Sequence, residues 1–384
     1  MSNGKIKLNI GGDKAIWVVV ILFSIYSILA VYSSSSSLAY RYQQDNTEYY
    51  LLKHLGILGL GLVLMYLTHL IPFQWFGRKS HYGITLSIFL LIAVLVFGTT
   101  MFDAKRYLVL PIINLTIQPS DFAKLALLIY LAWILSKARE EINDYRYFLT
   151  LLLFPTLIIT GLILPSNLST AAIVFFTSLV IMFIGRVRMK FLLITVGSLS
   201  VAFLIYLAIP KGSDSINRTS TWDKRIESYL GKSEEGTWQI THSKIAIAEG
   251  TILGKGPGNS NQKNWLPQVF SDFIYAIIIE EYGLAGGFGL ILIYLILLFR
   301  GIRIATKSNN IFGTILAFGL SFSLVFQAFI NMGVTVGLLP VTGQPLPLIS
   351  MGGTSIWFTS IAIGIMLSIS RFVEDTEKNV EAYA

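Results

Sequence analysis

The stretch DFIYAIIIEEYGLAGGFGLILIYLILLF, from Asp272 to Phe299, decides the fold class of this chain. Only three of its 28 residues are charged: Asp272, Glu280 and Glu281. A helix that crosses a bilayer needs about 20 predominantly apolar residues, and this stretch exceeds that length. Because backbone polar groups inside a bilayer must be paired within their own segment, the stretch predicts a transmembrane helix.

The composition of the whole chain agrees with this local pattern. Of its 384 residues, 54% are hydrophobic and 13% are charged, and that charged share is about half the usual value for soluble domains. An ordinary cytosolic enzyme and a disordered chain are therefore excluded. The absence of cysteine excludes thiol catalysis, disulfides and thiolate metal sites. The net charge of +8 follows mainly from membrane topology and does not indicate nucleic-acid binding.

Nine further apolar runs predict an all-α polytopic membrane protein with about ten transmembrane helices. The ten predicted spans are 15–39, 49–70, 82–102, 119–136, 147–164, 168–185, 191–209, 272–299, 311–336 and 353–372. We expect a single membrane domain over residues 1–384. Its large extracytoplasmic loop, 210–271, lies between spans seven and eight, and its short cytoplasmic tails are 1–14 and 373–384.

The distribution of Lys and Arg predicts the orientation. One set of short connections and tails carries 16 of the 29 Lys and Arg residues, whereas the short connections on the opposite side carry three. The basic side is cytoplasmic by the positive-inside rule, so both termini are predicted in the cytoplasm. The loops 103–118, 210–271 and 337–352 then face outward together. ATP, nicotinamide cofactors and sugar nucleotides are poor candidate ligands on that side.

The outward segment richest in candidate functional residues runs from Gly254 to Gly283. Its glycines at 254, 256 and 258 resemble a phosphate loop, but no GK[ST] follows and no strand precedes them, which favours a tight turn. Asp272 stands where this polar loop becomes an apolar helix. It could cap the helix N terminus, or it could act as a general base for an alcohol nucleophile at the mouth of a membrane cavity.

Glu280 and Glu281 lie in the apolar part of the same predicted helix. An unpaired carboxylate costs several kcal/mol at that depth, so it usually faces a cavity or a partner. Glu280 is eight positions from Asp272, about 800° of helix, which places it within about 80° of the same face. These carboxylates could therefore line one substrate-binding cavity. A buried carboxylate hydrogen-bonded to a neighbouring glycine-rich helix is an equal alternative for both.

Arg106 and Lys124 mark a second outward cluster. Pro119 suits the first turn of a helix, so Lys124 projects from about one turn inside the span. Lys124 could snorkel outward or pair with Asp121. Alternatively, Arg106 and Lys124 could bind the diphosphate of a lipid-linked substrate, because Arg can donate two parallel hydrogen bonds to phosphate oxygens and Lys supplies a compact positive charge.

Two further arginines and the histidines add weaker signals. Arg218 and Arg225 in the long loop are secondary candidates for binding the same diphosphate. The four histidines are scattered, at positions 54, 69, 81 and 242, and make no metal constellation. The sequence requires no cofactor, although a divalent cation, Mg or Mn, could assist a diphosphate.

A third cluster is the uncharged segment from Gly333 to Ser355, which is rich in Pro and Gly yet apolar. Non-helical backbone at membrane depth survives only where protein or a water-filled cavity surrounds it. We therefore expect a re-entrant loop that lines the cavity. The Pro and Gly residues of this loop are expected to have mostly structural roles.

These clusters resemble three signature regions of the SEDS family (shape, elongation, division and sporulation), whose main branches are RodA and FtsW. The regions are GKGPGNSNQKNWLP followed by SDFIYAIIIEEYG, KRYLVLPIINLTIQPSDFAKLALLIYLA, and GLLPVTGQPLPLISMGGTS. The resemblance extends from about residue 15 to 372 and includes the ten-span layout. The wording GNSxQK, with its continuation into SDFIY, is more similar to the FtsW division branch.

The resemblance implies a peptidoglycan glycosyltransferase. Members of the family polymerise lipid II, the undecaprenyl-diphosphate-linked disaccharide peptide, on the outer face of the bacterial cytoplasmic membrane. They work with a single-span class B penicillin-binding protein, and the FtsW branch implies other division proteins and the septum. The family's essential aspartate falls on Asp272, its Arg before the QPS segment on Arg106, and its Lys after that segment on Lys124.

The chain departs from the family pattern at several positions. Gln268 and Phe270 stand where members commonly read Glu and His, and Asn167 stands where a PDLGT element carries its acid. No acid–base or metal role transfers to these positions.

On this interpretation Asp272 takes a proton from the acceptor hydroxyl. The alternative of another class is a lipid II flippase, which needs no proton acceptor at the outer rim and whose polar residues should continue toward the cytoplasmic side. The charges within the predicted spans, at Lys53, Lys124, Glu280 and Glu281, lie mainly in the outer halves. A third alternative, a non-catalytic division scaffold, predicts that outer-loop charges are dispensable.

Overall fold

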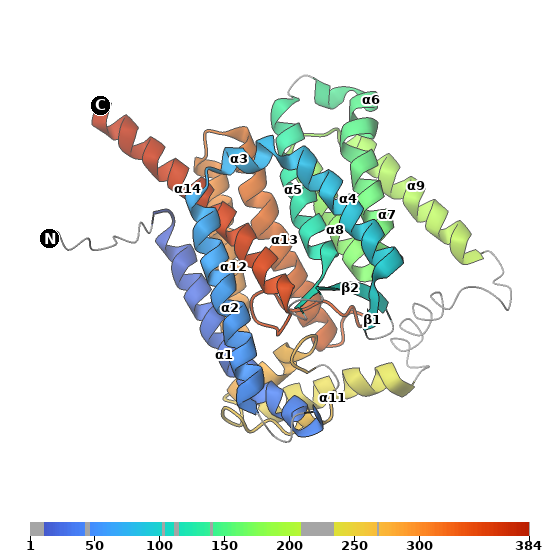
Figure 1. The fold of residues 1–384 in the computed structure, drawn as a ribbon, viewed down its shortest axis with the longest axis vertical. Helices are drawn as coiled ribbons and strands as arrows, with labels where there is room; N and C mark the ends of the chain where they lie inside the picture. Colours follow the sequence, from blue (N-terminus) through green and yellow to red (C-terminus); the bar gives the residue numbers. More distant parts are fainter. Residues whose placement is uncertain are drawn as a thin grey trace.

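The computed structural model describes residues 11–42, 47–101, 104–110, 115–138, 141–208, 234–266 and 269–383, and helices dominate it (Figure 1). The first half contains α1 Lys14–Tyr42, α2 Thr47–Leu70, α3 Phe73–Arg78, α4 Ser80–Phe97, β1 Thr99–Met101, β2 Ala104–Leu110, β3 Leu115–Ile117 and α5 Pro119–Lys137. The second half contains the 3-10 turn Glu141–Asn143, α6 Tyr145–Tyr147, the π-helical turn Phe148–Leu153, α7 Phe154–Ile163, α8 Leu168–Ile184, α9 Met189–Ala208, α11 Glu234–Gly250, the 3-10 turn Gln262–Asn264, α12 Ile274–Lys307, α13 Ile311–Thr335 and α14 Thr354–Tyr383.

Every predicted span corresponds to helix, which confirms the helical membrane fold. Within the described residues, eight helices are long and apolar enough to cross a membrane, while the apolar helices Leu168–Ile184 and Met189–Val201 are shorter. A total of ten crossings therefore stays a prediction. The predicted end of the third span at residue 102 is wrong, because Gly98 has extended backbone and leads the chain from α4 into β1.

The three strands were not anticipated in the predicted all-α fold. They form a small antiparallel sheet in the order β1-β2-β3, in which Leu108 pairs with Ile117. The sheet leads directly into α5. There the backbone N–H of Gln118 donates to the hydroxyl of Thr354, at the start of α14, at 3.1 Å. The sheet thus joins the beginnings of two helices that are far apart in the sequence.

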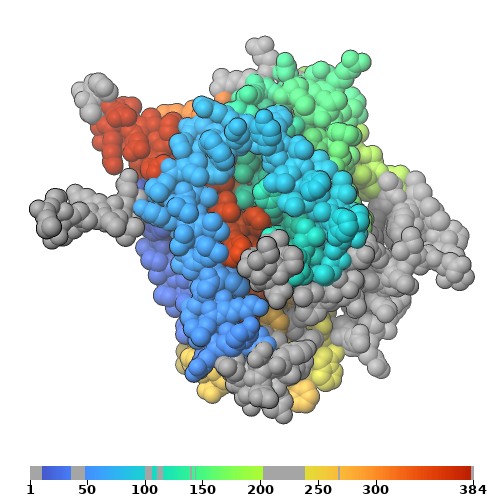
Figure 2. Space-filling model, viewed as in Figure 1, coloured from blue at the N-terminus to red at the C-terminus, as the bar shows by residue number. Residues whose placement is uncertain are grey.

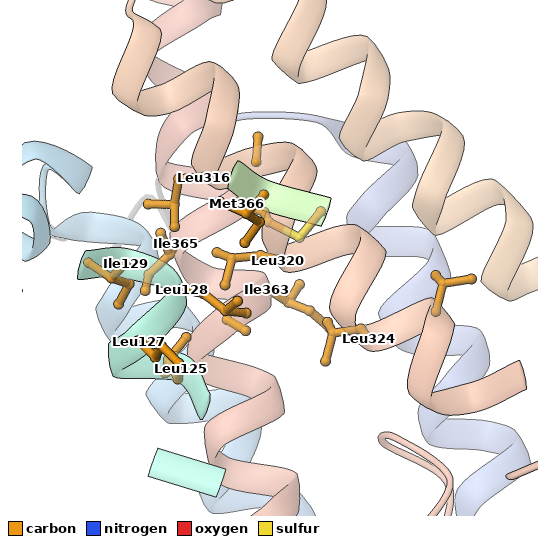
Figure 3. Close-up of a cluster of buried hydrophobic side chains, with 14 of the residues drawn as sticks. Leu125, Leu127, Leu128, Ile129, Leu316, Leu320, Leu324, Ile363, Ile365 and Met366 are labelled. Carbon is orange, nitrogen blue, oxygen red and sulfur yellow. The ribbon is translucent and has the colours of Figure 1, made fainter. Parts of the chain in front are cut away.

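Helices α5, α13 and α14 form the centre of the bundle. Their apolar windows are 72–78% buried, against 22–39% for α1, α2 and α4. Figure 3 shows leucine and isoleucine side chains of the three helices meeting in one cluster, including Leu128, Leu320 and Ile363. The outer helices instead expose large apolar side chains such as Phe97, 78% exposed, as expected of surfaces that face lipid. Figure 2 shows α14 at the surface between α2 and α4.

The two ends of the bundle differ. The sheet and α11 lie at one end, which we call the loop end, while the start of α1 and the end of α14 lie at the other, the tail end (Figure 1). At the tail end Arg300 pairs with Asp13 and Lys307 with Glu377. Within the predicted loop 210–271, residues Glu234–Gly250 form helix α11. The grouping of the described outward segments at one end agrees with the prediction, and their side of the membrane stays a prediction.

Candidate active site

Asp272 lies at the loop end, immediately before α12. This helix begins at Ile274, and its N-cap residue is Phe273, which makes no side-chain capping hydrogen bond. Asp272 therefore lies one position before the N-cap residue of the helix. Its carboxylate is partly exposed, and Oδ1 accepts a hydrogen bond from the Ser271 hydroxyl at 3.0 Å. A partly exposed carboxylate at a loop meets the first requirement for a general base, because a substrate hydroxyl can approach it.

A buried amide fixes the backbone at this carboxylate. Asn331 on α13 is 1% exposed, and its Nδ2 donates to the carbonyl of Asp272 at 2.9 Å. The same nitrogen donates to the carbonyl of Gln344 at 2.8 Å. Because both carbonyls depend on one side chain, Asn331 joins the loop that carries Asp272 to the segment after α13.

The segment from Gly337 to Gly353 has the character predicted for a re-entrant loop. It contains no helix or strand, yet its residues from Leu346 to Ser350 are buried. The Ser350 hydroxyl donates to the carbonyl of Ser271 at 2.6 Å, next to the candidate base. The third signature region therefore packs directly against the first.

Arg106 and Tyr107 belong to the second signature region. Arg106 Nε donates to the carbonyl of Ser166, in the turn between α7 and α8, at 3.2 Å. Burial raises the pKa of the Tyr107 hydroxyl. The positive charge of Arg106 lowers this pKa, and the carboxylates of Asp121 and Asp272 raise it further.

Lys124 projects into the bundle. Its Nζ donates to Gln327 Oε1 at 2.5 Å, and Gln327 donates to the carbonyl of Pro345 at 3.0 Å. The snorkelling interpretation is therefore wrong. Lys124 and Asp121 line a cavity of about 20 Å³ between α5, α13 and α14, which has room for about one water molecule. Through Gln327, Lys124 is connected to the segment at 337–353.

Glu280 and Glu281 are almost completely buried, at 0% and 1% exposure. Glu280 accepts hydrogen bonds from Lys255 Nζ at 3.0 Å and from the backbone N–H of Asn261 at 2.8 Å. Glu281 accepts a hydrogen bond from the hydroxyl of Ser33 on α1. These contacts favour the structural alternative over a substrate cavity shared with Asp272. The partner of Glu280 is a loop, where the sequence suggested a glycine-rich helix, and Glu281 is bound by Ser33 of helix α1 and by the Ser260 N–H at 3.3 Å.

Some predicted residues lie outside the described part of the chain: Arg218, Arg225 and Gln268. Among the residues that the structure describes, no three His, Cys, Asp or Glu side chains gather as a metal site requires. No described residue is therefore assigned to Mg or Mn.

Sequence reasoning missed the residues that connect the signature regions. Asn331, Gln344 and Ser350 are uncharged polar residues in apolar surroundings, a signal that a buried partner exists but not which one. Asn167, which stands where the family has an acid, is the N-cap of α8 and accepts a hydrogen bond from the Thr170 N–H at 3.2 Å. Gln344 Nε2 donates to the Thr170 hydroxyl at 2.7 Å. Where the family has an acid, this chain thus has an asparagine that caps a helix.

The fold and site define a polytopic membrane protein with a polar, partly exposed site at one end of its helix bundle. Residues 13–375 match the family of cell cycle proteins that comprises FtsW, RodA and SpoVE. The chain belongs to this family.

Relatives and solved structures are similar to this chain over nearly its whole length. A probable peptidoglycan glycosyltransferase FtsW of Geobacter metallireducens is 33% identical over 95% of this chain and 96% of its own. Stage V sporulation protein E of Bacillus subtilis is 31% identical over 94% of this chain and 97% of its own. A chain of a peptidoglycan synthase complex that coordinates polymerization and crosslinking superposes with a TM-score of 0.75 at 26% identity, covering 94% of this chain and 98% of that chain. The rod shape determining protein RodA of Thermus thermophilus gives a TM-score of 0.67 at 25% identity, with 94% and 97% covered.

Proposed function

We propose that this chain polymerises lipid II into glycan strands with Asp272 as its general base. The chain is a membrane-embedded peptidoglycan glycosyltransferase, the activity in the names of its FtsW relatives. The observation that carries the proposal is the position of Asp272. Its backbone carbonyl is held by Asn331, and its carboxylate is partly exposed.

In the proposed reaction, Asp272 takes the proton from the 4-hydroxyl of the acceptor sugar as that oxygen attacks C1 of the donor sugar. The bond from C1 to the diphosphate oxygen breaks, and undecaprenyl diphosphate leaves with the electron pair. Because the leaving group is already activated, one carboxylate suffices. The paired carboxylates of glycosidases are not required.

The diphosphate needs cationic partners as negative charge grows on the leaving oxygens. Arg106 donates a hydrogen bond from Nε to the carbonyl of Ser166. A guanidinium has further N–H donors, which a phosphate could accept. Lys124, whose Nζ donates to Gln327, is the second proposed cation. Arg218 and Arg225 of the long loop stay secondary candidates for the same contact.

The proposed partner is a single-span class B penicillin-binding protein. The similarity to a chain of a peptidoglycan synthase complex supports such a partner. We further propose that the FtsW-like chain acts at the division septum with other division proteins. The protein is a multi-pass protein of the bacterial inner membrane, and the Lys and Arg distribution supports cytoplasmic termini and an extracytoplasmic loop end.

The decisive experiment is polymerisation of labelled lipid II by the purified protein, with and without a candidate class B partner. We expect glycan ladders from the wild-type chain and none from Asp272→Asn. A flippase would instead move labelled lipid II across liposomes without making polymer, and a scaffold would do neither. Either of those outcomes would refute the proposed activity.

A further inference from the structure

Helix α12 is broken close to the candidate base. At Gly283 the backbone adopts φ 69° and ψ −175°, which is not helical. The turns before the break, from Ile274 to Tyr282, are therefore a short separate helix that follows directly after Asp272. Four backbone hydrogen bonds join the break to the loop that follows α11: Leu284 N–H to Thr251, Ala285 N–H to Ile252, Lys255 N–H to Glu280 and Gly256 N–H to Glu281.

Two glycines allow this close approach of loop and helix. A Cβ on Gly254 would lie 2.2 Å from the carbonyl oxygen of Glu281, and one on Gly283 would lie 2.1 Å from that of Ile252. Both glycines also have positive φ, at 82° and 69°, a conformation that other residues seldom adopt. At Gly254, therefore, the glycine-rich motif serves backbone packing.

The buried carboxylate of Glu280 accepts hydrogen bonds from the same loop. Besides Lys255 and Asn261 it accepts hydrogen bonds from the Ser260 hydroxyl and from the Gln262 N–H, the latter at 3.4 Å. A buried carboxylate without such partners would be strongly destabilising. The loop residues from Lys255 to Gln262 thus gather around one charge.

This arrangement holds both ends of the segment that leads to Asp272. At one end, Glu280 binds the backbone of Gln262, where a 3-10 turn begins. At the other end, Asn331 binds the carbonyl of Asp272. Only the nine residues from Lys263 to Ser271 lie between these anchors. The carbonyls of Phe270 and Ser271 also accept hydrogen bonds, from the Met351 N–H at 3.0 Å and the Ser350 hydroxyl at 2.6 Å. Loss of the Glu280 anchor would therefore free the Lys263 end of the segment, and the carboxylate would shift as far as these contacts allow.

We propose that Glu280 is a positioning residue for Asp272, acting through the 255–262 loop and paired with Lys255. This inference rests on the proposed role of Asp272 as general base. Glu280 has no contact with substrate in this account. Its charge holds the loop in the one arrangement that presents Asp272 to the acceptor hydroxyl.

The test uses the full-length chain under conditions in which the wild type polymerises lipid II. In Glu280→Gln one oxygen becomes an amide group that cannot accept hydrogen bonds. Because a misplacement of about 1 Å can cost about 100-fold in rate, we expect kcat to fall by about 10-fold to 100-fold, with KM for lipid II changed less than about twofold. Amide hydrogen exchange in residues 257–266 should become faster at the same time.

The matched control is Glu377→Gln, which removes a Lys–Glu pair of similar length, 2.9 Å to Lys307, at the tail end. It should leave both kcat and exchange in 257–266 unchanged. If Glu280→Gln does not fold, Lys255→Met provides the second variant, because the Lys255 side chain is 26% exposed while that of Glu280 is fully buried. It should lower kcat in the same direction. A wild-type kcat in the folded variant, or unchanged exchange in 257–266, would overturn the inference.

Asp272→Asn, measured in parallel, separates the two proposals. If that variant polymerises at the wild-type rate, the general-base role fails, and the positioning role fails with it. If it is inactive while Glu280→Gln is fully active, only the positioning role fails.

Discussion

Asn331 donates one hydrogen bond to the backbone carbonyl of Asp272, 59 residues away in the sequence, at 2.9 Å. Its Nδ2 also donates to the carbonyl of Gln344 at 2.8 Å. One side chain on α13 thereby sets the relative position of the candidate base and the segment at 337–353. The arrangement explains how a carboxylate in a loop can be held as firmly as catalysis requires.

Replacing Asn331 with Ala should reduce both stability and turnover. The buried carbonyl of Gln344 and the partly buried carbonyl of Asp272 lose their donor, and an unsatisfied buried group costs about 1–3 kcal/mol. We expect a lower unfolding temperature in detergent and a lower kcat for lipid II polymerisation. Asn309→Ala, at an exposed position of the tail end, is the control. An unfolding temperature equal to that of the wild type would contradict the hydrogen-bond assignment.

Asp272→Asn should abolish polymerisation without destabilising the protein. General-base catalysis contributes about 10²-fold to 10⁴-fold in rate, and Asp272 is not the N-cap residue of α12. Thermal unfolding should therefore match that of the wild type while the glycan ladder disappears. Retained polymerisation by a folded Asp272→Asn protein would remove Asp272 from the mechanism.

Substitution of Arg106 separates charge from geometry. Arg106→Gln should weaken donor engagement and slow polymerisation together, because charge on the leaving oxygens grows in the transition state. Arg106→Lys should recover little, since an ammonium cannot reproduce a two-pronged contact. Lys124→Gln provides the parallel measurement. Normal kinetics for both Gln variants would place the diphosphate elsewhere, and Arg218 and Arg225 would be tested next.

The ion pair between Glu249 and Lys255 predicts a pH dependence of stability. The hydrogen bond from Lys255 lowers the pKa of the Glu249 carboxyl from its ordinary 4.5. The pair's contribution is therefore complete above about pH 4.5 and is lost as the pH falls through the lower pKa of the folded state. Because both side chains are partly exposed, we expect about 1 kcal/mol or less.

Glu249→Gln should accordingly show a smaller drop in unfolding temperature than the wild type between about pH 6 and pH 3.5. The difference between the two proteins should shrink as the pH falls toward the lowered pKa of Glu249, because protonation of the carboxyl removes the ion pair. Equal drops in both proteins would mean that this pair contributes nothing measurable.

The orientation can be tested with single cysteines, because the chain has none of its own. Thr241→Cys on α11 and Thr306→Cys near the end of α12 both replace exposed residues. An impermeant thiol reagent should label position 241 in intact cells, and position 306 only after the membrane is opened. The reverse pattern would move the candidate site to the cytoplasmic side.

Local properties of the sequence were sufficient to predict the fold class. An apolar run of bilayer length must be helical wherever it occurs, so the positions of the helices follow from each run alone. The end of α4 at Phe97 and the three strands were not predicted, because a short sheet depends on pairing between segments. The resemblance to a family singled out Asp272 as the catalytic residue. Its residue type and position alone left two roles open, a helix cap and a general base.

The sequence by itself thus determined where the helices lie and which few charged residues stand among apolar ones. Only the tertiary structure decided the partners of those charges. Glu281 meets Ser33, 248 positions away, and Glu280 meets a loop about 20 positions away. The physical reason is that a buried charge must find hydrogen-bond partners, and which partners are within reach depends on how the helices and loops pack together.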